Sequence, residues 1–540
     1  MKKTKIFLTA ICSGLLVGGC NDLDKEPMSN VVTQIMKEQI VDNDPGMVSA
    51  SVNAIPNMVN AFMNTFQTHQ DYGWSSMMLM LDSRGMDMPS DLGGYQWYTA
   101  ALEYSDFGGL YYDNLYYWYT NYNMIRSANA VAAVIPEDTE DATSQYNRAQ
   151  ALAYRAWGYF NLAQMYAWTY EREPQGQCVP LVLDTNMNET ATTGCARATT
   201  EEVYTQVLKD IDEAISLLKS AEAAGVTRKT EAATANLEKT YFNLAAAYGM
   251  RARANLFKCD YEACAQDCQN ALQECAKDDI TPYQREEFAA PRFVDITDHS
   301  WILGIYNDPS TSYSKGIANF DSFMSAWTDF SYAAKGMFRR INKVLYAEIP
   351  GSDVRKGWWL NENGGTPASL SSTYGELIAA AKIAWQPYTQ VKFGCNVEDI
   401  NVHATDVPLM RIEEIYLMLA EAQAYSNPSQ GVQTLTNFVT QFRDPGFSLR
   451  ASSFKEVQEE IWFQRRIELW GEGFSFWDIK RLQKPVNRVG GGFDPTICFN
   501  IAPSNTCLLF DIPQQEAQRN ALITNPSHGS TVPSPVEDKN

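Results

Sequence analysis

The side chains that most often carry out acid–base or metal chemistry are few and scattered in this chain. The sequence has no Gly-x-Ser-x-Gly nucleophile motif, no His-Glu-x-x-His zinc motif and no phosphate-binding loop. Its four histidines show no metal-ligand spacing, and we interpret each as structural: His69, His299, His403 and His528. The 64 acidic residues leave open one enzymatic alternative, a glycoside hydrolase or lyase with two carboxylates across a cleft.

Aromatic side chains are the more informative group. They make up 12% of the chain, with 13 tryptophans and 28 tyrosines. An aromatic ring can stack on the apolar C–H face of a sugar in water, so this composition favours binding of carbohydrates or other flat ligands. The formal net charge of −21 argues against nucleic acid or an anionic membrane surface as a partner, because both are also negative.

The first 20 residues have the pattern of an export signal. A basic start is followed by an apolar run over residues 6–16, which is too short to span a membrane. The segment LVGGC, which ends at Cys20, resembles a bacterial lipobox and predicts a lipid on that cysteine, with plain secretion as the alternative. Acidic residues 22 and 24 resemble a surface-export signal of gut-type Gram-negative lipoproteins. We expect a lipid-anchored protein on the outer membrane, facing the cell exterior.

The remaining cysteines suggest packing more than chemistry. Export to an oxidising compartment permits disulfides, and two local pairs could close loops: Cys178 with Cys195, and Cys498 with Cys507. Three others share one face of a predicted helix, where we interpret them as small apolar contacts between helices and not as metal ligands: Cys264, Cys268 and Cys275. We expect no metal and no cofactor.

Long helices are expected over much of the chain. Helical patterns cover residues 110–135, 142–170, 200–224, 237–275, 408–425 and 430–442, and Thr200 is expected to cap the third. The segment 237–275 resembles a tetratricopeptide unit, with two helices joined by a turn at residues 258–261. The earlier helices could form degenerate versions of the same unit. The spacing therefore predicts an array of stacked helix pairs.

Between these helices lies a region of different character. Over residues 278–400 prolines, glycines, asparagines and serines multiply, and residues 300–306 are typical of a strand. Long loops in a folded domain usually carry function. At the other end of the chain, residues 510–526 are expected to form a strand and then a loop.

One segment combines large aromatic residues with charges. Residues 461–482, IWFQRRIELWGEGFSFWDIKRL, predict two helices broken by two glycines. Arg465 and Glu468 lie three residues apart, as do Asp478 and Arg481, so the members of each pair can meet on one helix face. We interpret this segment as an interior seam in which aromatics pack and charges are paired. The alternative is an amphipathic helix with exposed ion pairs.

Several of these segments, in this order, resemble the SusD/RagB family of outer-membrane nutrient-binding lipoproteins. They are the lipobox, ALAYRA, CVPLVL, the tetratricopeptide-like unit, DVR, PLMRIEEIYLMLAEA, RRIELWGEGFSFWDIKRL and FDIPQQE. Ile467, Trp470 and Gly471 depart mildly from the family pattern. The resemblance covers nearly the whole mature chain. It implies a mainly helical single domain, with about four tetratricopeptide-like helix pairs as scaffold and a loop-rich ligand face with short strands.

The resemblance also implies boundaries and a role. A signal peptide would occupy residues 1–19 and a SusD-like domain residues 20–540, with helical parts at about 40–280 and 404–540 and a loop-rich insert at about 281–403. Family members capture an oligosaccharide, or in some cases a peptide, and deliver it to a SusC-like TonB-dependent transporter without chemistry on the ligand. A tetratricopeptide scaffold for protein partners alone is a third alternative, but it would not need tryptophans and tyrosines in polar loops.

Ligand-binding aromatics in this family come from loops after the first helices and from the segment after the central helix pair. This places the candidates here by region only, and core packing is the competing role for each ring. The aromatic candidates are Trp74, Tyr95, Trp97, Trp301, Tyr313, Trp327 and Tyr332. The polar candidates are Asp71, Asp82, Arg84 and Asn319. We expect Trp470 and Trp477 to belong to the seam.

The seam gives the first testable prediction. If Arg465 and Asp478 are interior structural charges, replacing either one should lower the melting temperature in a thermal unfolding experiment, because its partner would be left buried and unpaired. Ligand affinity should stay close to that of the wild type. A variant that melts normally but binds differently would contradict the structural interpretation.

Overall fold

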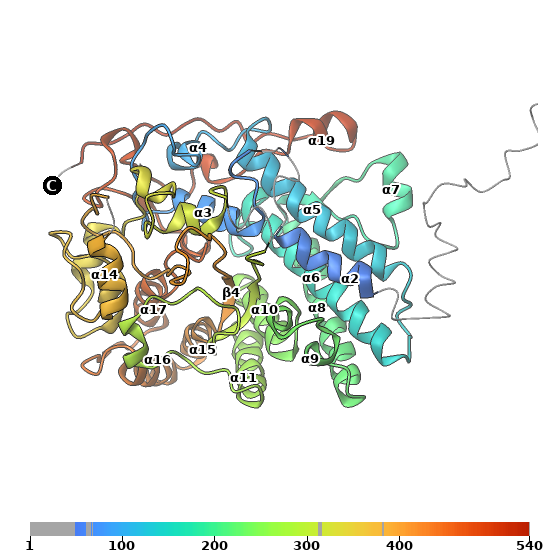
Figure 1. Ribbon diagram of the computed structural model, residues 1–540. Helices are drawn as coiled ribbons and strands as arrows, with labels where there is room; N and C mark the ends of the chain where they lie inside the picture. The colour runs from blue at the N-terminus through green and yellow to red at the C-terminus, as the bar shows by residue number, and fades with distance from the viewer. Residues whose placement is uncertain (1–48, 61–65, 67, 311–315, 381–382, 539–540) are drawn as a thin grey trace, which may run out of the picture.

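The computed structural model describes residues 49–60, 66, 68–310, 316–380 and 383–538 (Figure 1). Helices dominate this part of the chain, and the strands form short two-stranded antiparallel pairs. The fold is mainly α, with tetratricopeptide-like helix pairs, which confirms the predicted fold class. No helix within the described ranges is long and apolar enough to cross a membrane.

A row of long helices forms the scaffold. In chain order these are α5 (Tyr112–Ala132), α6 (Ala142–Tyr166), α8 (Thr200–Ala223), α10 (Leu244–Phe257), α11 (Tyr261–Lys277), α15 (Ile412–Ser426), α16 (Pro428–Phe442) and α17 (Phe454–Glu468). Each packs on the next through the row from α5 to α16, and α17 packs on α15 and α16 (Figure 1). The predicted helix pairs are therefore present and stack as expected.

Shorter elements fill the spaces around the scaffold. The helices are α2 (Ser49–Val59), α3 (Trp74–Arg84), α4 (Thr99–Glu103), α7 (Met187–Thr193), α9 (Arg228–Glu231), α12 (Phe320–Met324), α13 (Lys343–Glu348), α14 (Ser372–Ala380), α18 (Ser475–Arg481) and α19 (Gln514–Arg519). The strands are β1 (Gln177–Pro180), β2 (Arg197–Thr199), β3 (Trp301–Ile305), β4 (Val407–Arg411), β5 (Val486–Asn487) and β6 (Asn500–Ile501).

Local sequence explains how the scaffold helices begin and how closely they pack. Thr199, not Thr200, caps α8: its hydroxyl accepts a hydrogen bond from the backbone N–H of Glu202, whose side chain accepts one from the backbone N–H of Thr199. The hairpin between α15 and α16 requires glycine at position 431, because a Cβ there would lie 2.5 Å from the Cβ of Ala424. Small side chains thus permit the close helix crossings that stacked pairs need.

Two sequence-based expectations for elements are wrong. Residues 407–411 are not the start of the next helix but strand β4, which pairs antiparallel with β3 and is buried along its whole length. Residues 510–526 contain helix α19, where a strand was expected, because Pro513 starts a run of good helix formers. The strand predicted over residues 300–306 is confirmed as β3.

The two cysteine pairs that could have closed local loops are not bonded in the structure. Cys178, Cys195, Cys498 and Cys507 are all free thiols in the structure. The three cysteines on α11 are buried between helices, as predicted: Cys264, Cys268 and Cys275. Among the described residues, no group of histidine, cysteine and acidic side chains could hold a metal ion.

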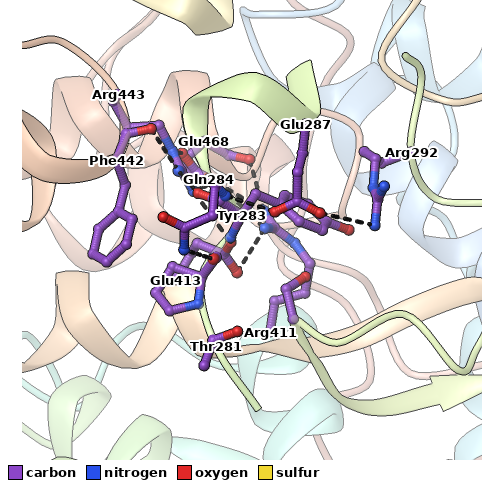
Figure 2. Close-up of polar contacts among 12 residues, drawn as sticks. Thr281, Tyr283, Gln284, Glu287, Arg292, Arg411, Glu413, Phe442, Arg443 and Glu468 are labelled. Carbon is purple, nitrogen blue, oxygen red and sulfur yellow. Dashed lines mark hydrogen bonds and ion pairs between the residues drawn. The ribbon is translucent and has the colours of Figure 1, made fainter. Parts of the chain in front are cut away.

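Glu468, at the end of α17, is the centre of a buried cluster of charges (Figure 2). Its carboxylate accepts hydrogen bonds from Arg443 at 2.8 and 3.0 Å, and from Arg411 and Arg355 at 3.3 Å. Four cations here face four carboxylates, so the charges balance. We call this set the buried ion cluster: Asp353, Arg355, Lys392, Arg411, Glu413, Arg443, Glu468 and Glu472.

The buried ion cluster joins distant segments of the chain. Arg411 ends β4, Arg443 follows α16, and Lys392 comes from the loop-rich region between α14 and β4. Lys392 donates to the carboxylate of Glu472 at 2.7 Å and to the backbone carbonyl of Glu468 at 2.8 Å. Burial lowers the pKa of Lys392 to about 8, against the opposing pull of Glu472. Burial would raise the pKa of Glu468, but its arginine partners hold it well below the usual range.

The seam predicted at residues 461–482 is confirmed as interior, with one difference in its pairing. Asp478 accepts hydrogen bonds from Arg465 and from Arg481, each at 2.7 Å, and all three side chains are buried. Glu468 pairs instead with the arginines of the buried ion cluster. Trp470 is buried as well, and its indole N–H donates to the backbone carbonyl of Asp87.

Replacement of Glu468 by glutamine should destabilise the protein strongly. Loss of the central negative charge leaves four buried cations facing three carboxylates, and such an uncompensated buried charge typically costs about 3–5 kcal/mol. Because the pKa of Glu468 is lower in the folded protein than in the unfolded chain, its contribution is present at pH 7 and lost only as the pH falls through the folded-state value. Urea denaturation at pH 7 measures the effect.

The matched control is Glu376→Gln, which removes the same charge from an exposed position on α14. This variant should unfold within about 0.5 kcal/mol of the wild type. Equal stability of the Glu468 and Glu376 variants would show that the buried ion cluster contributes nothing to the fold.

Candidate functional site

Four rings from three separate segments form a partly exposed group, which we call the aromatic cluster: His69, Tyr95, Trp97 and Tyr332. The Tyr95 side chain is 53% exposed and Trp97 is 38% exposed, which is unusual for rings of this size. The imidazole of His69 stacks on the indole of Trp97, with centroids 4.5 Å apart and planes 20° apart. Tyr95 lies 6.0 Å from Tyr332, ring centre to ring centre.

The loop that carries Tyr95 and Trp97 is fixed by amide side chains. Gln96 points inward and donates to the hydroxyl of Ser90 at 2.8 Å and to the backbone carbonyl of Asp91 at 3.1 Å. Gln70 donates to the backbone carbonyl of Trp97 and, at 2.9 Å, to the carboxylate of Asp113. Since Gln96 is buried between two exposed aromatic residues, the backbone presents both neighbouring rings on the outside.

Tyr332 is held from below by a stack of rings. It stacks on Phe323 of α12 with centroids 4.4 Å apart, and Phe323 in turn stacks on Tyr72 at 5.6 Å. The Tyr332 hydroxyl forms a hydrogen bond with the ring of His69. The cluster therefore rests on a packed core, and its exposed rings have a fixed position relative to one another.

Arg339 connects the two sides of the aromatic cluster. It is almost completely buried, donates to the backbone carbonyl of Phe323 at 3.0 Å and lies 3.4 Å from the side-chain oxygen of Gln96. Its guanidinium also lies over the ring of Tyr98. Burial lowers the pKa of Arg339, and Tyr98 and Tyr72 oppose that shift. One buried cation thus ties the loop that bears Trp97 to the helix that supports Tyr332.

This arrangement suits a flat, weakly polar ligand. His69 covers one face of the Trp97 indole, and Trp97 still keeps part of its surface open to solvent. Tyr95 adds a second exposed ring with a hydroxyl at its tip. Aromatic faces with nearby polar tips are the groups that bind sugar rings in water.

Comparison with known families decides which family the chain belongs to. Residues 23–242 match a family described as starch-binding and associating with the outer membrane, and residues 388–527 match the SusD family. The chain belongs to the SusD/RagB family. No curated protein sequence matches it.

Solved SusD-like structures share its fold. A SusD-like carbohydrate binding protein from Bacteroides vulgatus is 24% identical, with a TM-score of 0.70 over 89% of this chain and 98% of its own. A SusD superfamily protein from Bacteroides thetaiotaomicron is 19% identical, with a TM-score of 0.67 over 90% and 99% of the two chains. A laminarin-binding SusD-like protein is 17% identical, with a TM-score of 0.61 over 90% and 99%.

In this SusD/RagB protein, Tyr332 is buried next to the exposed rings, and three other predicted aromatic residues lie in the core. Trp74 packs edge-on against Trp157 with centroids 5.0 Å apart. Trp301 in β3 is completely buried, and its indole donates to the hydroxyl of Tyr283 at 3.2 Å. Trp327 is buried and donates to the backbone carbonyl of Phe393 at 2.9 Å. Their surroundings give these rings packing partners and no open face for a ligand.

The predicted polar residues are also buried, and each already has a hydrogen-bond or ion-pair partner within the fold. Arg84 forms an ion pair with Asp106 among three aromatic rings, and Asp82 accepts from the backbone N–H of Gly473 at 3.0 Å. Burial raises the pKa of Asp82 to about 8. Asp71 accepts from the backbone N–H of Phe66, and Asn319 caps α12. These side chains serve the fold by holding neighbouring backbone segments in place.

The structure brings together Tyr95, Trp97 and Tyr332 from the two predicted regions. Sequence reasoning missed His69, because a histidine without metal-ligand spacing gives no sign that it stacks on a tryptophan. It also missed Phe330, which is 51% exposed two residues before Tyr332. Tyr313 and Cys20 lie outside the described residues.

A hollow of about 630 Å³ lies between residues 291–298 and 395–406, and none of the four rings is among the described residues that line it. None of the predicted ligand residues is among the described residues that line it. Three of its charged side chains already have partners: Asp406 accepts from two backbone N–H groups, and Arg292 pairs with Asp298. The exposed aromatic cluster remains the better candidate for a binding site.

Proposed function

We propose that this protein binds oligosaccharide at the cell surface through the aromatic cluster. The observation that supports the proposal best is the exposure of Tyr95 and Trp97 on a rigid base, with one face of the indole covered by His69. Membership of the SusD/RagB family agrees with this role. Two structural neighbours are described as carbohydrate-binding and laminarin-binding, so glycans are the first ligands to test.

We further propose that the protein delivers its ligand to a SusC-like TonB-dependent transporter and performs no chemistry on it. In this proposal residues 1–19 are a signal peptide, Cys20 carries the lipid that anchors the protein to the outer membrane, and residues 20–540 form one SusD-like domain facing the cell exterior. Peptide or another nutrient is the alternative ligand for the same complex, and a helical glycoside hydrolase or lyase is the enzymatic alternative.

Removal of the exposed indole should weaken glycan binding without unfolding the protein. A glycan array identifies a ligand, and isothermal titration calorimetry then compares the wild type with Trp97→Ala. The dissociation constant should rise about tenfold or more, which corresponds to about 1.4 kcal/mol. The matched control is Tyr425→Ala, which removes an exposed ring on α15, 59% accessible, that does not belong to the aromatic cluster.

Two results would count against this assignment. Identical titrations for the wild type and Trp97→Ala would remove the aromatic cluster as the binding site. Shortened oligosaccharides, found by chromatography after incubation of the bound glycan with purified protein, would favour the enzymatic alternative.

The anchor gives a separate prediction. Cys20→Ala should abolish lipidation, so that the expressed protein leaves the membrane fraction and moves to the aqueous phase in a detergent phase separation. Cys195→Ala, which removes a partly exposed thiol of the folded domain, is the control and should stay in the membrane fraction. A Cys20 variant that remains lipid-bound would contradict the proposed anchor.

A further inference from the structure

His403 has two hydrogen-bond partners that can only accept. Its Nδ1 lies 2.8 Å from the carboxylate of Asp321, and its Nε2 lies 2.9 Å from the backbone carbonyl of Phe330. The ring is buried. A neutral imidazole carries one N–H, so it can donate to only one of these oxygens, whereas an imidazolium donates to both. The geometry therefore fits the charged form of His403.

These two bonds join segments that support the aromatic cluster. Asp321 belongs to α12, whose Phe323 stacks beneath Tyr332. Phe330 is at the exposed tip of the segment 325–332, which ends in Tyr332 itself. Elsewhere this segment is tied by neutral bonds, such as that from Trp327 to the carbonyl of Phe393. His403 is thus its charged attachment to the rest of the fold.

We propose that the imidazolium of His403 is a positioning residue that holds the segment 325–332 in its binding geometry, so that ligand affinity depends on the charge of this ring. This inference rests on the proposed function, because it assumes that the aromatic cluster is the binding site. His403 itself does not contact the ligand.

The groups around His403 include one other that changes charge near neutral pH, because burial raises the pKa of Asp406, three residues along the chain, to about 8. The comparison with His403→Gln separates the two groups. Asp321 is the direct partner of His403. Burial raises the pKa of Tyr374 on α14 to about 12 and raises that of the Cys395 thiol, so both stay neutral. Asp329 on the same segment and Asp399 on the preceding loop are exposed to solvent.

The direction of the pH effect follows from the pKa of His403. Burial lowers it, but the hydrogen bond and charge of Asp321 and the carbonyl of Phe330 raise it above the ordinary 6.5 overall. A group with a raised pKa stabilises its folded arrangement fully below the unfolded value and loses that contribution as the pH rises through the folded value. Above it, the ring releases one proton to water, keeps Nδ1–H on Asp321 and turns an Nε2 lone pair toward the carbonyl of Phe330.

Calorimetric titration with the glycan at pH 6.0 and pH 8.5 tests the proposal. Loss of the charge weakens the hydrogen bonds of His403, although the neutral ring retains part of them, so wild-type affinity should fall about threefold to tenfold at the higher pH. His403→Gln should remove this pH dependence. The matched control is His299→Gln, which alters another histidine paired with a carboxylate, Glu287 at 2.8 Å, and should keep the wild-type profile.

A second measurement works without a ligand. In the protein with isotope-labelled histidine, NMR titration should place the pKa of His403 above 6.5, and Asp321→Asn should lower it. A His403 pKa at or below 6.5, or equal pH dependence in the wild type and His403→Gln, would overturn the proposal. If no glycan binds the wild type at any pH, the proposed function fails. The NMR titration, together with hydrogen exchange of residues 326–332, then still decides whether the charged ring holds the segment.

Discussion

Burial of opposite charges around Glu468 is the constraint on which the rest of the structure depends. Three arginines from separate parts of the chain converge on this one carboxylate, inside a core where an unpaired charge is very costly. Such a set is stable only when every member is in place. The arrangement therefore forces the loop-rich region and the helical scaffold into one relative position, which hydrophobic contact alone would specify less sharply.

The candidate site depends on that position. Its rings come from a loop near residue 70, from the loop before α4 and from the segment after α12, and no single element could assemble them. The exposed rings are held in place by contacts with the core. These contacts come from Arg339 and from the ring stack of Tyr332, Phe323 and Tyr72. Binding to such a site would require little reorganisation of the protein, which favours affinity.

The sequence predicted the helical scaffold well, because the helix period and the small residues at close helix crossings can be recognised from the spacing of nearby residues. It also located the seam, where alternating aromatics and charges are incompatible with a surface. It failed at β4, since a strand that pairs with residues about a hundred positions away leaves no local signal that distinguishes it from the start of a helix. The prediction of the partner of Glu468 was wrong for the same reason, because its actual partners are remote in sequence.

Within the site, sequence could name regions but not sort exposed rings from buried ones. Trp97 and Trp327 both lie in polar segments, yet one is exposed and the other donates a hydrogen bond within the core. The covering of one indole face by His69 has a consequence of its own. A ring with one face covered can stack a sugar only on the other face, so this part of the site would meet a glycan from one side.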